Sequence, residues 1–257
     1  ILVAKGIEPS FAVGVEHDEA VEVVVVEGHG GGGRGVRRRV DSGEDEAVAV
    51  VVGVVGGLRV AIGKEVTNSP SFIWWVVNRL AFLVGSTNVA TFLLFFLQER
   101  FPDLGGGKAA GPAATIMMVV GIFILLTALP TGWLADRIGK VKLIALAGLL
   151  AVAGMGVLLI IPSMAAIYIG GSIVGISIGI FYSANWALGT EIVPREHAGR
   201  YLGLSNLAGA GAGAIGAYIG GPIADSQGYT FILGLYTLLF LISIMALAGV
   251  KQKQQAK

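Results

Sequence analysis

The sequence contains no cysteine and few charged residues for its length. Without cysteine it has no disulfide, no thiolate metal ligand and no cysteine nucleophile. Charged residues make up 14% of the 257 residues and apolar ones 54%, a composition that does not suit a surface in water. The formal net charge of +1 provides no basic field of the kind that binds nucleic acid, so we expect no nucleic-acid partner.

Histidines are few, and acidic residues are absent from the long apolar runs. The three histidines, His17, His29 and His197, are isolated from one another, and the long apolar runs contain no acidic residue. The apolar runs therefore offer no metal-ligand cluster, no pair of catalytic carboxylates and no nucleophile with a base. We expect no catalytic residue, no metal site and no cofactor, and hence a protein that is not an enzyme.

Residues 1–68 differ in composition from the rest of the chain. They are rich in valine and glycine and poor in leucine, and their apolar runs are too short or too interrupted for a membrane span of about 20 residues. Residues 28–33 have the spacing of a dinucleotide-binding turn, but the basic residues that follow do not suit the helix of such a fold. We interpret residues 1–68 as a low-complexity segment, either a disordered connector or an out-of-frame translation, and the chain as a fragment.

From residue 72 onward, apolar stretches recur that are long enough to cross about 30 Å of hydrocarbon. Lipid offers no partners for unpaired backbone groups, and the stretches lack the alternation of barrel strands, so we expect helices. The expected spans are residues 72–97, 113–134, 143–161, 165–188, 202–224 and 230–249, within a membrane domain of residues 69–257. The predicted fold class is an all-α membrane protein of six transmembrane helices with an irregular N-terminal segment.

Basic residues between the spans predict their orientation. Most follow span two, span four or the last span: Arg137, Lys140, Lys142, Arg195, Arg200, Lys251, Lys253 and Lys257. The opposite loops hold only Arg100 and Lys108. By the positive-inside rule, both ends of the six-helix unit face the cytoplasm, and we expect a multi-pass protein of the cell membrane with the lipid bilayer as its first partner.

Two turns repeat one pattern at an offset of 89 residues. Residues 132–139 read GWLADRIG and residues 221–228 read GPIADSQG, so both fit G-x-[LI]-A-D-x-x-G. Three spans separate the two turns, which therefore lie on opposite sides of the membrane. This spacing predicts an inverted repeat of three plus three helices.

The first turn resembles the signature loop of the major facilitator superfamily. Residues 132–142, GWLADRIGKVK, match the pattern G-x-x-x-D-R-x-G-x-[RK]-[RK] except at Val141. In that family the loop is a cytoplasmic gate element that recurs between helices eight and nine. The resemblance implies that the spans are helices seven to twelve, with a complementary N-terminal half as partner. The implied gate residues are Gly132, Asp136, Arg137, Gly139, Lys140 and Lys142.

Residues 182–206 resemble the corresponding region of bacterial facilitators related to sugar:proton symporters. The resemblance implies a secondary active transporter that moves a small solute, such as a sugar with protons, by alternating access. Efflux of drugs or metabolites is an alternative of the same class. A non-transporting membrane scaffold and a gene remnant are alternatives of a different class.

Polar side chains within the spans are expected to face a solute cavity, because lipid does not satisfy them. The candidates are Arg79, Ser86, Thr87, Asn88, Tyr182, Asn185, Trp186 and Asn206. Neutral hydrogen-bonding groups with aromatic platforms suit a sugar and equally a broad drug pocket. Arg79 lies only about two helical turns into its span, so we expect its side chain to extend to the cytoplasmic interface, with a cavity role as the alternative.

Glycines at helical spacing predict close contacts between helices. One stripe is Gly171, Gly175 and Gly179; the other is Gly209, Gly213, Gly216 and Gly220. Small residues let helix backbones approach one another. Smooth packing of this kind would permit rocking during alternating access, and rigid packing is the alternative.

Overall fold

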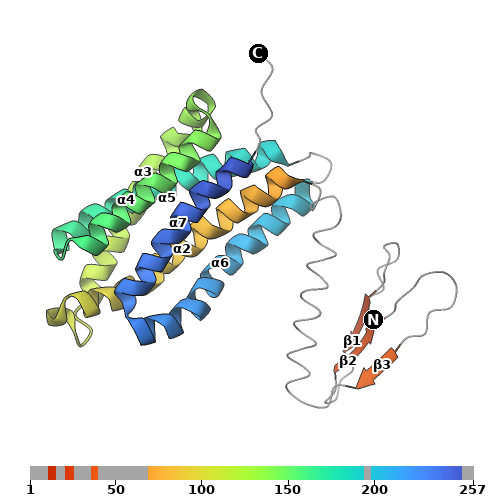
Figure 1. Ribbon diagram of the computed structural model, residues 1–257, viewed down its shortest axis with the longest axis horizontal. Helices are drawn as coiled ribbons and strands as arrows, with labels where there is room; N and C mark the ends of the chain where they lie inside the picture. The colour runs from red at the N-terminus through yellow and green to blue at the C-terminus, as the bar shows by residue number, and fades with distance from the viewer. Residues whose placement is uncertain (1–10, 16–20, 26–35, 40–68, 194–197, 251–257) are drawn as a thin grey trace. The chain divides into compact units, whose positions relative to one another are not determined.

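The computed structural model describes residues 11–15, 21–25, 36–39, 69–193 and 198–250. The chain divides into two units, Ile1–Gly63 and Lys64–Lys257, which are described separately. Figure 1 shows strands in the first unit and long helices in the second.

The described part of the first unit is a three-stranded antiparallel sheet (Figure 1). Strand β1 (Phe11–Val15) pairs with β2 (Val21–Val25), and β2 pairs with β3 (Val36–Arg39). Valine is frequent in these strands, and its branched Cβ favours extended backbone. The sequence predicts an irregular segment here, and the three strands correct that prediction. The glycine-rich residues 28–33 lie outside the described residues.

The described part of the second unit contains six long helices joined by short connections (Figure 1). They are α2 (Pro70–Arg100), α3 (Ala110–Ile138), α4 (Lys140–Ile160), α5 (Met164–Ile192), α6 (Ala198–Gln227) and α7 (Tyr229–Ala246). Two short 3-10 helices, η1 (Pro102–Leu104) and η3 (Leu247–Gly249), follow α2 and α7. Each expected span coincides with one long helix.

Five of these helices, α2, α3, α4, α5 and α7 with η3, are long and apolar enough to cross a membrane. Helix α6 has 30 residues and is not among the five. The described helices therefore supply five candidate spans where the sequence predicts six.

The packing of the long helices follows a regular pattern. Helix α5 packs against α3 and α4, helix α2 packs against α6 and α7, and α4 packs against α7. When α2, α3 and α4 are matched in order with α5, α6 and α7, the contacts of α5 with α3 and α4 correspond to the contacts of α2 with α6 and α7. Where α2 and α5 meet, Phe82 stacks on Phe181 with ring centroids 3.6 Å apart, and Phe240 of α7 lies 5.1 Å from Phe82.

The two turns with the repeated pattern have the same backbone conformation. Gly139 joins α3 to α4 with φ 101°, and Gly228 joins α6 to α7 with φ 91°. The N–H of Gly139 donates to Ala135 O at 3.1 Å, and the N–H of Gly228 donates to Ala224 O at 2.8 Å. Residues other than glycine rarely adopt such φ values, so both turns need glycine at their last position.

Candidate functional site

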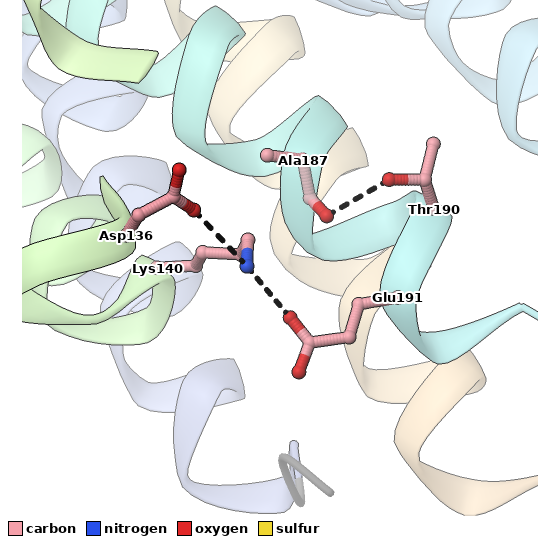
Figure 2. A network of polar contacts seen from close by, with 5 residues as sticks. All are labelled: Asp136, Lys140, Ala187, Thr190 and Glu191. Carbon is pink, nitrogen blue, oxygen red and sulfur yellow. Dashed lines mark hydrogen bonds and ion pairs between the residues drawn. The ribbon is translucent and has the colours of Figure 1, made fainter. Parts of the chain in front are cut away.

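Lys140 links the turn after α3 to the end of α5 (Figure 2). Its Nζ lies 2.9 Å from Glu191 Oε2 and 3.8 Å from Asp136 Oδ1. The side chains of Lys140 and Glu191 are 16% and 22% exposed, whereas that of Asp136 is 77% exposed. Because water screens exposed ion pairs, the Lys140–Glu191 pair is the stronger of the two links.

The remaining residues of the signature loop lie at the surface or against α5. The guanidinium of Arg137 stacks on the Trp133 ring at 3.8 Å, and both side chains are exposed. Lys142 is exposed as well. A Cβ at Gly132 would lie 3.8 Å from Ser183 Oγ of α5, which is ordinary contact. The loop thus presents one carboxylate and two basic groups outward and uses Lys140 to bind α5.

A second acidic residue, Glu99, binds the turn between α6 and α7. Glu99, near the end of α2, accepts hydrogen bonds from the backbone N–H of Tyr229 at 2.5 Å and of Thr230 at 3.1 Å, at the start of α7. A carboxylate stabilises the positive N-terminus of a helix. Glu99 is not recognisable as a site residue from the sequence, because its partners lie 130 and 131 residues away in the chain.

The contacts place the two turns at opposite ends of the helices. Trp75, near the start of α2, donates to the carbonyl of Asn185 in the second half of α5 at 3.2 Å, so α5 ends where α2 begins. The ion pair with Glu191 puts the first turn at that end. The bonds of Glu99 put the second turn at the end where α2 finishes.

Arg79 lies inside the bundle. Its side chain is 6% exposed, and its Nη1 donates to Asn185 Oδ1 of α5 at 2.9 Å. Its Cζ lies 5.9 Å from the centre of the Trp75 ring and 5.5 Å from that of Trp186. The expectation that Arg79 extends to the interface is therefore wrong. An amide oxygen and two indole rings attract the guanidinium within the helix packing.

A chain of hydrogen bonds continues from Arg79 across three helices. Asn185 Nδ2 donates to Asn78 Oδ1 at 2.9 Å. Asn78 Nδ2 donates to the Ser243 carbonyl of α7 at 2.9 Å and to Ser243 Oγ at 2.8 Å. All four side chains are buried. We call Asn78, Arg79, Asn185 and Ser243 the central polar cluster. Asn78 and Ser243 were not among the expected site residues, and their signal in the sequence is a polar residue within an apolar run.

Two other cavity candidates serve the packing of α2. Ser86 is buried and donates to Leu83 O of its own helix at 3.4 Å. Asn88 is buried, and its Nδ2 donates to Val84 O at 2.9 Å and to Ala212 O of α6 at 3.3 Å. These bonds fasten α2 internally and to α6.

The remaining candidates are exposed. Tyr182 and Trp186 lie one turn apart on α5, whereas Thr87 lies on α2 and Asn206 on α6. A Cβ at Gly213 of α6 would lie 3.2 Å from Thr87 Cγ2. Of the eight candidates, the described contacts bring together Arg79, Asn185 and Trp186, with Tyr182 next to them along α5.

The glycine stripes lie at helix contacts. A Cβ at Gly175 of α5 would lie 2.7 Å from Val120 O of α3, and a Cβ at Gly171 would lie 3.4 Å from Ile116 Cγ2. Gly179 faces the backbone of α3 in the same way. On α6, added Cβ atoms would meet α2 at Gly209, Gly213 and Gly216, and both α2 and α7 at Gly220. The two stripes thus fill corresponding contacts, α5 with α3 and α6 with α2.

The comparison with protein families agrees with this architecture. The family model of the Major Facilitator Superfamily matches the chain in two overlapping ranges, residues 33–217 and 77–255. No curated protein matches the chain. The matches include all six long helices and confirm the resemblance noted at residues 132–142 at the level of the superfamily, whose members are transporters rather than enzymes. With five apolar helices among its described residues, the chain is a multi-pass membrane protein, and it belongs to the Major Facilitator Superfamily.

Proposed function

We propose that the chain is one six-helix half of a secondary active transporter that moves a small solute by alternating access. The observation that carries the proposal is the pairing of the two turns: the same backbone conformation, at opposite ends of the helices, 89 residues apart. The corresponding contacts of α5 and α2 support an inverted repeat of three plus three helices, with α6 as the sixth span. Such repeats let one half rock around a central solute site.

The signature loop is proposed as the gate of this half. Lys140 ties the start of α4 to the end of α5 through Glu191, while Asp136 remains largely exposed. An exposed carboxylate at a loop is free to contact a complementary six-helix half in one conformation and to release it in the other. Arg137 and Lys142 favour the cytoplasmic side for this loop, because basic residues are enriched there.

The solute is proposed to pass the face that Tyr182 and Trp186 present, since both rings are exposed beside the central polar cluster. The resemblance of residues 182–206 to sugar:proton symporters supports a sugar with protons. The same aromatic rings suit the efflux of a drug or metabolite. Proton coupling is assigned to the complementary half, because the six expected spans contain no acidic residue.

The test is solute uptake by vesicles from cells that express this chain within a protein carrying both six-helix halves. Asp136→Asn removes the exposed carboxylate of the signature loop, and Asp225→Asn is its matched control in the second copy of the pattern. We expect the first variant to abolish uptake and the second to retain it. Equal uptake by both variants would contradict the role of the signature loop as a gate. Loss of uptake with a protonophore would support proton coupling. Failure of the membrane-inserted protein to take up any sugar, drug or organic anion would contradict transport.

A further inference from the structure

We propose that Arg79 binds an anionic group of the solute, so that the transported solute is a small organic anion such as a carboxylate. This inference rests on the proposed function and, of the solutes proposed there, favours an acidic metabolite or drug over a sugar. The supporting observations are the burial of the Arg79 guanidinium, its lack of a counter-charge among the described residues and its unused N–H donors.

Arg79 is a buried cation, and no carboxylate among the described residues forms an ion pair with it. Among the described residues, the ion pairs at the membrane domain involve Lys140, and none involves Arg79. Its nearest polar partner is the neutral amide of Asn185. The two indole rings attract the cation but do not neutralise it. A buried charge without a counter-charge is costly, so the site favours any ligand that brings a negative charge.

Donor groups of the site remain unused. A guanidinium has five N–H donors, and the hydrogen bond to Asn185 uses Nη1. The Arg79 Nε is buried and has no hydrogen-bond partner within the described structure. The same is true of Ser205 Oγ on α6. A Cβ at Gly209 would lie 3.9 Å from both Nε and Nη2 of Arg79, and Ser205 is one turn before Gly209. Two unsatisfied polar groups therefore lie on neighbouring stretches of α2 and α6.

The geometry of these donors suits a carboxylate better than a hydroxyl. The edge of a guanidinium presents parallel N–H groups that match the two oxygens of a carboxylate. A sugar hydroxyl would engage one of them and leave the charge uncompensated. The positive charge of Arg79 and the parallel N–H groups of its guanidinium thus argue against a neutral sugar.

The neighbouring aromatic side chains suit the body of an organic acid. The centre of the Trp186 ring lies 5.5 Å from the guanidinium carbon, and the residues Trp186 and Tyr182, one turn earlier on α5, are 41% and 45% exposed. Exposed rings on one face offer apolar surface on which a planar or hydrocarbon group can stack. An acid with an apolar or aromatic body would place its carboxylate on Arg79 and its body against these rings.

The test is isothermal titration of the purified chain in lipid nanodiscs with benzoate and with benzamide, a neutral molecule of nearly the same shape. We expect benzoate to bind in a saturable manner and benzamide to bind at least ten times more weakly. Arg79→Gln should weaken benzoate binding about 10- to 100-fold, as loss of a charged hydrogen-bonding partner does. Arg100→Gln, at the end of the same helix, is the matched control and should bind as the unaltered chain does.

Two further variants keep the test decisive if Arg79→Gln does not fold. Arg79→Lys keeps the positive charge and loses the parallel N–H groups of the guanidinium. This variant should bind benzoate more weakly than the unaltered chain does. Asn185→Asp places a carboxylate 2.9 Å from Nη1 and should exclude benzoate while the helical circular dichroism is retained. Equal binding of benzamide, benzoate binding unchanged by Asn185→Asp, or no benzoate binding at all would overturn the inference.

The titration also separates this inference from the proposed function. A chain that binds benzoate through Arg79 while its parent protein transports nothing would contradict transport alone. If the protein with both six-helix halves takes up neutral solutes while the chain does not bind benzoate, the anion site alone is contradicted. Self-association of the chain that Arg79→Gln abolishes, without benzoate binding, would assign Arg79 to a protein carboxylate instead.

Discussion

Replacement of Gly175 by alanine should push helices α3 and α5 apart. The added Cβ would lie 2.7 Å from Val120 O, 3.1 Å from Val120 Cα and 3.2 Å from Phe123 Cβ. The first two atoms belong to the backbone of α3, so no side-chain rotation relieves the overlap. Overpacking of this kind costs about 1–3 kcal/mol.

Gly121→Ala is the matched control for this substitution. Gly121 lies within α3, and a Cβ there would meet nothing within 4 Å. Alanine in a helix interior is favoured over glycine by roughly 0.5–1 kcal/mol, and both variants receive this gain. The difference between the two variants therefore isolates the steric cost, and we expect Gly175→Ala to be less stable than Gly121→Ala by about 1–3 kcal/mol.

The assay is unfolding of the purified chain in mixed micelles by titration with sodium dodecyl sulfate, followed by circular dichroism at the helical minimum. Each variant gives a free energy of unfolding under the same lipid and detergent conditions. Equal stability of the two variants would refute the close contact of α5 with α3 at Gly175. It would also remove the basis for assigning this stripe to helix packing.

Three other single substitutions and one double variant test the turns and their acidic contacts by the same unfolding assay. Gly139→Ala should cost about 1–3 kcal/mol, because φ 101° strains any other residue, and an unchanged stability would contradict that turn. Glu99→Gln should cost about 0.3–1 kcal/mol through loss of the charge at the start of α7, with no loss expected if the carboxylate were free. Lys140→Met should destabilise the chain by about 1–3 kcal/mol, because it leaves Glu191 largely buried without a partner. Adding Glu191→Gln to Lys140→Met should restore part of that loss, and strictly additive effects of the two would show that the pair does not interact.

The helices could be predicted from the sequence because their signal is local. A stretch of about 20 apolar residues has few alternatives in lipid, and each expected span falls on one long helix. The repeated pattern ending at Gly139 and Gly228 was also readable, since positive φ restricts those positions to glycine. The strands β1 to β3 were missed because short valine-rich runs among glycines and charges carry little periodicity.

The central polar cluster could be predicted only in part, because its partners come from separate helices. Arg79 and Asn185 were candidates as polar residues in apolar runs, but the bond between them spans 106 residues. Arg79 lies only about two turns into its helix, so its guanidinium was expected at the membrane interface. The guanidinium instead turns inward, because Asn185 on α5 offers it a hydrogen-bond acceptor. Ser243 lies in a mostly apolar helix, and nothing in its neighbourhood pointed to Asn78, which lies 165 residues earlier.

The most direct test of the account is the side of the membrane on which each repeated turn lies. The chain has no cysteine, so Ile138→Cys and Gln227→Cys introduce single labels at equivalent, exposed positions of the two turns. Six spanning helices in an inverted repeat predict that a membrane-impermeant maleimide labels Gln227→Cys in intact cells. The same reagent should label Ile138→Cys only after the membrane is opened. Labelling of both positions from one side would contradict the account.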